Sequence, residues 1–329
     1  MKALSPRKRL PLAIQSAVSI GLLLLLFRSL DLAALRHLYA TMPLWFYLMS
    51  LAVVVGGQTL YAWRWRQVLS AAGVPVTVGT AIQQYFIGIF LNNFFPSTVG
   101  GDMAKVYYLG RDHGYRPIAA SIVLDRLLSI GLLAVLAAAM YWIAPDPSPQ
   151  FAATRALVTA IALFLIVGLV LAARGTGGLP QRLARFGTLA VGLAERAQRF
   201  RHDMAAAARR PRIVFQSAAV VTTYFFALTA TYRVFLQINT TAHPAYLTLL
   251  TAVTTASLLS NIPISVNGLG LREQLHAILL APLGVPREAA VAISLLIFAH
   301  LLVSSLLGLL FWFRLPADVK SHIPNPEGI

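Results

Sequence analysis

Long apolar stretches separated by short polar segments dominate the chain. Six of them are long enough to cross a bilayer as helices, because spanning a hydrocarbon core of about 30 Å takes about 20 apolar residues. These stretches are 11–30, 43–62, 117–143, 155–173, 212–236 and 286–313. The apolar runs are continuous and do not alternate residue by residue, which disfavours a transmembrane β-barrel. The pattern predicts an all-α, polytopic integral membrane protein in which residues 1–329 form a single transmembrane domain.

Composition supports this class. The chain is 58% hydrophobic and only 12% charged, with a mean hydropathy of +0.72, whereas about a quarter of the residues in a soluble domain are charged. Cysteine is absent, which excludes disulfides and thiolate metal sites. The basic N-terminus and the run 11–30 superficially resemble a signal peptide. That run is long and has no clear small-x-small cleavage site, so we interpret it as a retained first helix.

The net charge of +16 is concentrated in one segment, since residues 174–212 contain nine arginines against Glu195 and Asp203. Loops enriched in Lys and Arg remain cytoplasmic, so this segment is predicted to be a basic cytoplasmic loop. A membrane-topology signal accounts for the charge, and no nucleic-acid partner is expected. The loop is also a possible docking surface for anionic lipid or for a cytosolic lipid-modifying enzyme.

Charge bias also predicts the topology in the cytoplasmic (inner) membrane. The N-terminus, the 174–212 loop and the C-terminus are predicted to be cytoplasmic, whereas 144–150 and 237–245 carry no Lys or Arg and are expected outside. Between Arg66 and the stretch 117–143, the chain must therefore enter and leave by the same face. The segment 246–285 must do the same from the opposite face.

A repeated phrase lies inside each of these segments. Residues 96–101 read Pro-Ser-Thr-Val-Gly-Gly and residues 263–268 read Pro-Ile-Ser-Val-Asn-Gly. We predict two re-entrant helical hairpins, 78–113 and 246–284, each bent at its phrase. Such backbone is tolerated at membrane depth only when it is buried in protein or lines a wet cavity. The residues expected at the bends are Pro96, Gly100, Gly101, Pro263, Gly268 and Gly270.

The hairpins and their flanking helices form an inverted repeat, with a first copy at 43–143 and a second at 212–314. The prediction is thus about six full spans plus two hairpins, or at least eight hydrophobic segments. Helices interrupted at matching places in two halves indicate the binding site of a repeat-built transporter.

Six charged residues fall within the predicted membrane segments: Asp102, Lys105, Asp125, Arg126, Arg272 and Glu273. Ionisable groups at this depth are costly unless paired or wet, which makes them functional candidates. Lys105 and Arg272 each follow the repeat proline by nine residues and are expected, with the half-helix N-termini, to face an anionic group. Asp102 and Glu273 are expected in the first turn of each returning helix, where a purely structural capping role is equally open.

Asp125 and Arg126 are adjacent in sequence, and neighbours on a helix do not face one another. The expected partner of Asp125 is Arg272, and that of Arg126 is Glu273 or a ligand. Two amides at the bends complete the predicted substrate site, which comprises Asn93, Asp102, Lys105, Asp125, Arg126, Asn267, Arg272 and Glu273. No Asp-x-Asp signature or nucleotide-binding βαβ context occurs, so no metal, cofactor or catalytic residue is predicted.

Three phrases carry a resemblance to a known family. They are Asn92-Asn93-x-x-Pro96-x-x-x-Gly100-Gly101-Asp102, Asp125-Arg126, and Pro263-Ile-Ser-x-x-Gly268-x-Gly270-x-Arg272-Glu273. Together they resemble the lysylphosphatidylglycerol synthase transmembrane, or flippase-like, family over roughly residues 10–315. The resemblance implies a polytopic bacterial or archaeal protein. It also implies the movement of aminoacylated phosphatidylglycerol between leaflets, whereas a separate C-terminal domain of such proteins makes that lipid. The chain ends at Ile329 without that domain, so aminoacyl-transferase activity is not expected.

The leading hypothesis is a non-enzymatic lipid translocase that moves an anionic phospholipid or lipid-linked headgroup across the membrane. Lys105, Arg126 and Arg272 would hold the phosphate. One alternative is a membrane enzyme that modifies a lipid-linked substrate, with Asp125 or Glu273 as a base. Another is a non-catalytic subunit of a lipid or envelope biosynthesis complex. The lipid, its direction of travel and the oligomeric state are left open by the residues.

Overall fold

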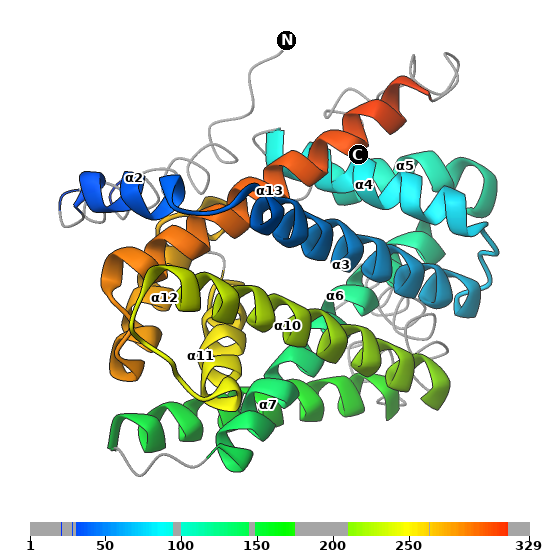
Figure 1. The fold of residues 1–329 in the computed structure, drawn as a ribbon. Coiled ribbons are helices and arrows are strands. Elements are labelled where there is room, and N and C mark those ends of the chain that lie inside the picture. Colours follow the sequence, from blue (N-terminus) through cyan, green and yellow to red (C-terminus); the bar gives the residue numbers. More distant parts are fainter. Residues whose placement is uncertain are drawn as a thin grey trace.

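The computed structural model describes residues 21, 28, 31–94, 100–144, 149–174, 210–262 and 264–314, and the regular structure in these ranges is helical (Figure 1). Five helices are long and apolar enough to cross a membrane. They are α3 (Leu44–Ala71), α6 (Tyr115–Ile143), α7 (Pro149–Arg174), α10 (Pro211–Asn239) and α13 (Arg287–Phe313). The all-α, polytopic architecture is therefore as predicted. The expected first span, 11–30, lies outside the described residues apart from its positions 21 and 28.

Two pairs of shorter helices occupy the ranges predicted for the hairpins. The first pair is α4 (Val78–Phe94) and α5 (Gly100–His113), and the second is α11 (Tyr246–Leu259) and α12 (Leu271–Leu280). Short 3₁₀ turns, η2 (Val266–Gly268) and η3 (Ala281–Leu283), flank α12. Each pair is interrupted where the repeated phrase occurs, and its two helices pack on each other. That each pair enters and leaves by one membrane face stays a prediction.

The two pairs exchange packing partners. Helix α4 packs along α13, and α11 packs along α6, so the first arm of each pair lies on the last long helix of the other half. The second arms stay within their own halves, with α5 on α6 and α12 on α13, while α3 and α10 contact each other. An internal duplication would produce this reciprocal pattern, although the boundaries 43–143 and 212–314 remain a prediction.

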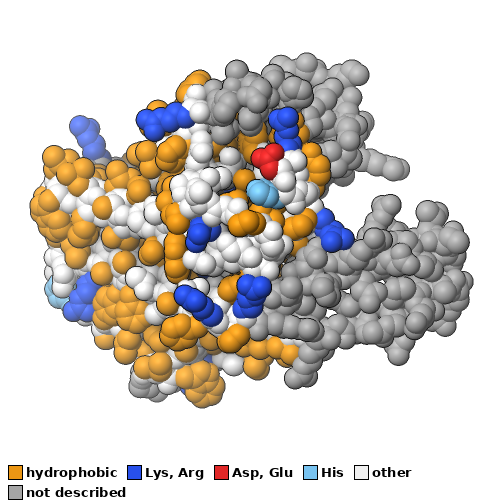
Figure 2. All heavy atoms as spheres, turned by 90° about the vertical axis from the view of Figure 1, so that its right-hand side faces the viewer, with side chains coloured by type: hydrophobic (Ala, Val, Ile, Leu, Met, Phe, Trp, Pro, Cys, Tyr) orange, Lys and Arg blue, Asp and Glu red, His pale blue; other side chains and the backbone are white. Residues whose placement is uncertain are grey.

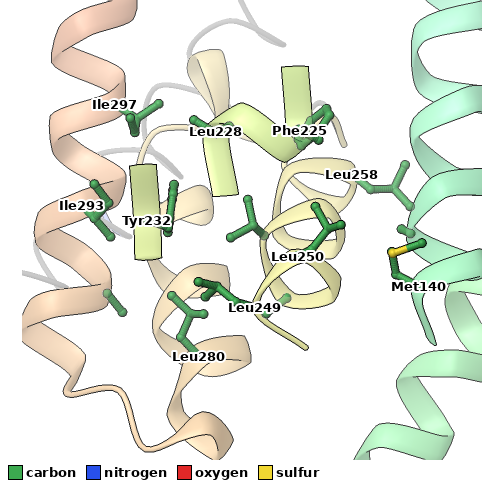
Figure 3. Packing of buried hydrophobic residues seen from close by; sticks show 14 of the residues in the cluster. Met140, Phe225, Leu228, Tyr232, Leu249, Leu250, Leu258, Leu280, Ile293 and Ile297 are labelled. Atoms are coloured by element: carbon green, nitrogen blue, oxygen red, sulfur yellow. The ribbon is translucent and has the colours of Figure 1, made fainter. Parts of the chain in front are cut away.

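The largest apolar core lies around α11. In Figure 3, Leu249, Leu250 and Leu258 of α11 are surrounded by side chains from α6, α10, α12 and α13. Leu249 and Leu250 are fully buried. Helix α11 carries no charged residue, and apart from Tyr246 its polar residues are threonine and serine, which suits a helix enclosed by others on several sides.

Glycines allow α4 to approach both α13 and α5 closely. A Cβ atom at Gly308 of α13 would lie 2.1 Å from the backbone oxygen of Phe86 on α4. A Cβ atom at Gly101 of α5 would lie 1.8 Å from the backbone oxygen of Gly88 on α4. Small residues are the usual means by which membrane helices bring their backbones together. Helix α4 is thereby fixed between α5 and α13.

Helix α3 differs from its predicted range of 43–62, because it continues to Ala71. The prediction ended the span at the first arginines, but Arg64 pairs inside the protein and the Arg66 Nε donates to the backbone oxygen of Val76 at 2.8 Å. A short helix that was not predicted, α2 (Leu32–Ala40), begins at Asp31, whose Oδ1 accepts from the backbone nitrogens of Ala33 and Ala34.

Candidate functional site

Asp102 is the centre of the first charged cluster. It lies in the first turn of α5, and its two carboxylate oxygens have different partners. Lys105 Nζ donates to Oδ1 at 3.3 Å, while Arg126 Nε donates to Oδ2 at 2.8 Å. A second Arg126 nitrogen, Nη2, also donates to Oδ2. One carboxylate is thus shared by two cations, and three of the predicted site residues meet here.

The two cations of this cluster differ in exposure. The Lys105 side chain is buried, with its Nζ 4.6 Å from the centre of the Tyr85 ring and 5.2 Å from that of Trp65. Ring faces attract cations in such geometry. The Arg126 side chain is 55% exposed. Arg126 is therefore the cation of this cluster that a molecule from outside the protein can reach.

Asp125 pairs with Arg64 and not with Arg272 as expected. Its Oδ1 accepts from Arg64 Nε at 3.0 Å and from Nη2 at 2.7 Å, and Nη2 also donates to Ser129. The Arg64 side chain is only 1% exposed. The prediction failed because a sequence does not show how α6 is rotated against its neighbours, and this rotation turns Asp125 towards Arg64 on α3. Asp125 faces α3, while Arg126 faces α5.

The charged residues of the second half form their own pair. Arg272 Nη2 donates to Glu273 Oε1 at 2.7 Å, and the Gly270 backbone nitrogen donates to Oε2 at 2.7 Å. Glu273 is fully buried and caps the N-terminus of α12, which is the structural role left open above. The expected pairing of Arg126 with Glu273 is therefore wrong. Arg272 also lies 4.5 Å from the ring centre of Phe298.

The interruptions of the two helix pairs meet through amides. Asn267 Nδ2 donates to the side-chain oxygen of Asn93 at 3.3 Å and to the backbone oxygen of Asn92 at 3.4 Å. Asn92 Oδ1 in turn accepts from the backbone nitrogen of Gly101 at 2.8 Å. The predicted residues Asn93 and Asn267 are thus brought together, although they are far apart in sequence. Polar contacts thus join the two halves of the protein between the last turn of α4 and the turn η2.

The glycines expected at the bends have two different roles. Gly268 and Gly270 have positive φ angles of 74° and 80°, a conformation that side chains disfavour. Gly100 and Gly101 instead begin helix α5, where Gly101 serves close packing on α4. Pro96 and Pro263 lie outside the described residues, as does most of the 174–212 loop.

Sequence reasoning missed Arg64, Tyr85 and Trp65 as site residues, and it left Asn92 outside the predicted substrate site. Arg64 follows the apolar run 43–62, a place where an arginine usually marks the cytoplasmic end of a span. The signal that could have found it is the apolar pattern on both sides, since Tyr61, Trp65 and Val68 continue the buried face of one helix. Tyr85 and Trp65 become relevant only when Lys105 is placed between their rings.

The arrangement presents cations that can bind an anionic group. Four cations, Arg64, Lys105, Arg126 and Arg272, face three carboxylates, Asp102, Asp125 and Glu273. Among the described residues this leaves one positive charge without a carboxylate of its own, and it lies in the cluster around Asp102. Within the described residues, no three His, Asp or Glu side chains lie close enough together to hold a metal ion.

Comparison with known proteins gives the family. The chain is 30% identical over 89 residues to the UPF0104 membrane protein PH1989 of Pyrococcus horikoshii, a match that covers 26% of this chain and 27% of that protein. No solved structure matches the chain. The family model for the lysylphosphatidylglycerol synthase TM region matches residues 12–308. The chain is therefore a membrane protein that belongs to the lysylphosphatidylglycerol synthase TM region family.

Proposed function

We propose that this protein is a lipid translocase that moves an anionic phospholipid or lipid-linked headgroup across the cytoplasmic membrane. The observation that carries the proposal is the shared carboxylate of Asp102. Because it serves both Lys105 and Arg126, the cluster retains one uncompensated positive charge, and a headgroup phosphate supplies the missing anion.

The exposure of Arg126 supports the same assignment. The Arg126 side chain is 55% exposed on helix α6, next to Val123 and Leu127, which are also exposed. Arginine presents a planar set of donors that matches phosphate oxygens, and a charge at membrane depth is retained where it serves a function. In the proposed cycle the phosphate oxygens accept hydrogen bonds from Arg126, while the acyl chains remain beside the apolar face of α6.

The contact of Asn267 with Asn92 and Asn93 supports a gate between the two helix pairs. It joins the two interrupted helix pairs through hydrogen bonds of 3.3–3.4 Å, which are long and neutral and therefore weak. Separation of the two pairs at this contact would open a polar path past Asp102 and Arg126. The proposal assigns no catalytic residue and no cofactor.

The proposed orientation places the termini in the cytoplasm. The face at the right of Figure 1 carries Lys and Arg side chains among hydrophobic ones (Figure 2). Exposed arginines at the end of α5 and the starts of α6 and α10 are Arg111, Arg116, Arg210 and Arg212. Cytoplasmic faces are enriched in such residues. We extend the proposal to a cytosolic lipid-modifying enzyme as the partner of the 174–212 loop.

The test is lipid exchange in proteoliposomes that contain a fluorescent phosphatidylglycerol. Arg126→Ala should slow exchange by roughly tenfold or more, because a hydrogen bond to a charged group contributes about 1.5–3 kcal/mol. Arg233→Ala is the matched control, since Arg233 lies in the membrane-spanning helix α10 outside the charged cluster. Exchange at the unsubstituted rate in folded Arg126→Ala protein would contradict the assignment.

A further inference from the structure

A cavity of about 310 Å³ lies between α6, α7, α11 and the end of α12. Its walls include Tyr141, Phe151, Thr248, Thr251 and Ile278 and contain none of the charged residues of the cluster around Asp102. The volume falls at the lower end of the range of about 300–1,000 Å³ that is typical of ligand-binding pockets.

The lining is uncharged. Its residues are apolar or carry hydroxyl groups. The Thr251 hydroxyl donates a hydrogen bond to the backbone oxygen of Leu247 at 2.8 Å. An ionised headgroup in this cavity would lose its hydration without gaining a counter-charge. A hydrocarbon chain with ester groups matches the walls, because it is equally uncharged and needs only occasional hydrogen-bond donors.

The cavity is open towards the bilayer side of the protein. Among the described helices, α7 packs closely on α6, and α7 and α12 are not among the helix pairs that pack closely on each other. Ile278 of α12, which lines the cavity, is 64% exposed, and α7 exposes Leu157 and Phe164. In a membrane protein, apolar side chains on such an outer surface face lipid.

The cavity also lies at a suitable depth. Tyr141 is two residues from the end of α6, Phe151 is near the start of α7, and Thr248 is near the start of α11. At a rise of about 1.5 Å per residue, these positions are within about 5 Å of the helix ends. The ester region and upper acyl chain of a lipid lie at this level of a bilayer.

We propose that this cavity binds one acyl chain of a bilayer phospholipid, with its ester region among the hydroxyl groups of the lining. The site goes beyond the proposed translocation, because it would hold a lipid whether or not that lipid crosses the membrane. Helix α7, which has no counterpart in the reciprocal packing of the two halves, forms one wall of the site.

The test uses the full chain in nanodiscs that contain phosphatidylglycerol with a photoreactive diazirine in the upper acyl chain. After illumination, mass spectrometry locates the lipid adducts. Peptides that contain Thr248, Thr251 or Leu279 should carry more adduct than the outer face of α7 around Phe164. Thr248→Phe and Ala252→Phe, which fill the cavity from one wall, should reduce these adducts to the level of that outer face.

Leu247→Phe is the matched control. It adds the same ring on the same helix at a position that is 38% exposed and does not line the cavity, and it should leave the adducts unchanged. Adducts on the lining that do not exceed those at Phe164, or that survive both filling substitutions, would overturn the proposal. The experiment does not measure lipid exchange, so failure of the proposed translocation would be recorded separately.

Discussion

Arg64 and Arg126 are the same type of residue on neighbouring helices, yet their surroundings differ. Each donates two hydrogen bonds to one carboxylate oxygen. The Arg64 side chain is 1% exposed, whereas that of Arg126 is 55% exposed. A buried charge depends on its partner because water cannot replace it. The pair between Arg64 and Asp125 therefore has a structural role, while Arg126 remains available to a ligand.

Replacement of Asp125 by leucine should test this division of roles. Asp125→Leu leaves the Arg64 charge buried without its carboxylate, and the loss of one partner of a buried pair costs about 3–5 kcal/mol. We expect a large fall in the melting temperature of the detergent-solubilised protein.

The double variant Arg64→Met/Asp125→Leu provides the control. Apolar side chains of similar size often replace a buried pair at little cost, so the double variant should be more stable than Asp125→Leu alone. A double variant that is no more stable than the single one would show that the pair is not the source of the loss.

The sequence shows which charged residues lie in the apolar segments, but it does not show which of them pair with each other. The sequence identified Asp102, Lys105, Asp125, Arg126, Arg272 and Glu273 because charges are rare in apolar segments. It predicted the wrong partner for Asp125, and Glu273, one of the two partners expected for Arg126, was also wrong. Partner choice depends on how α3 and α5 are rotated against α6, and a list of charged positions contains no information on rotation.

At the scale of elements, helix α4 depends on two close backbone contacts. Gly88 of α4 meets Gly101 of α5, and Phe86 of α4 meets Gly308 of α13. In lipid, close packing replaces the hydrophobic effect as the force between helices. The position of the first interrupted pair is therefore sensitive to single methyl groups.

Gly308→Ala should destabilise the protein measurably. The new Cβ atom would lie 2.1 Å from the Phe86 backbone oxygen, and backbone atoms cannot rotate away as a side chain does. Overpacking of this kind costs about 1–3 kcal/mol, which a thermal unfolding curve in detergent resolves.

Gly131→Ala is the matched control for this substitution. Gly131 also lies within a long helix, α6, but a Cβ atom there meets nothing within 4 Å. Alanine is a better helix former than glycine by about 1 kcal/mol, so this variant should be as stable as the unsubstituted protein or slightly more stable. Equal losses in the two variants would contradict the packing argument.

At the scale of the whole molecule, the helix ends that carry arginine are different from the helix ends that carry neither Lys nor Arg. The described ends of α5 and the starts of α6 and α10 carry exposed arginines. The opposite ends include the segment after α10, which contains Thr241 and has neither Lys nor Arg up to Tyr246. This separation agrees with the proposed orientation.

Single cysteines should report that orientation directly, because the chain contains no cysteine of its own. His113→Cys and Thr241→Cys place a thiol at an exposed position on each predicted side. A membrane-impermeant maleimide should label Thr241→Cys in intact cells and His113→Cys only after permeabilisation. The reverse pattern would invert the topology, and labelling of both in intact cells would contradict it.

Sequence alone determined the membrane class, the long helices and the positions of the two interruptions. Each of these depends on local composition: apolar runs set the spans, and Pro and Gly break them. Tertiary structure alone decided that α4 lies on α13 and α11 on α6, that Asn267 reaches Asn93, and that Asp102 serves two cations. The physical reason is that in lipid every apolar helix face is equally tolerated, so the choice of neighbour is made by close packing and a few buried polar contacts.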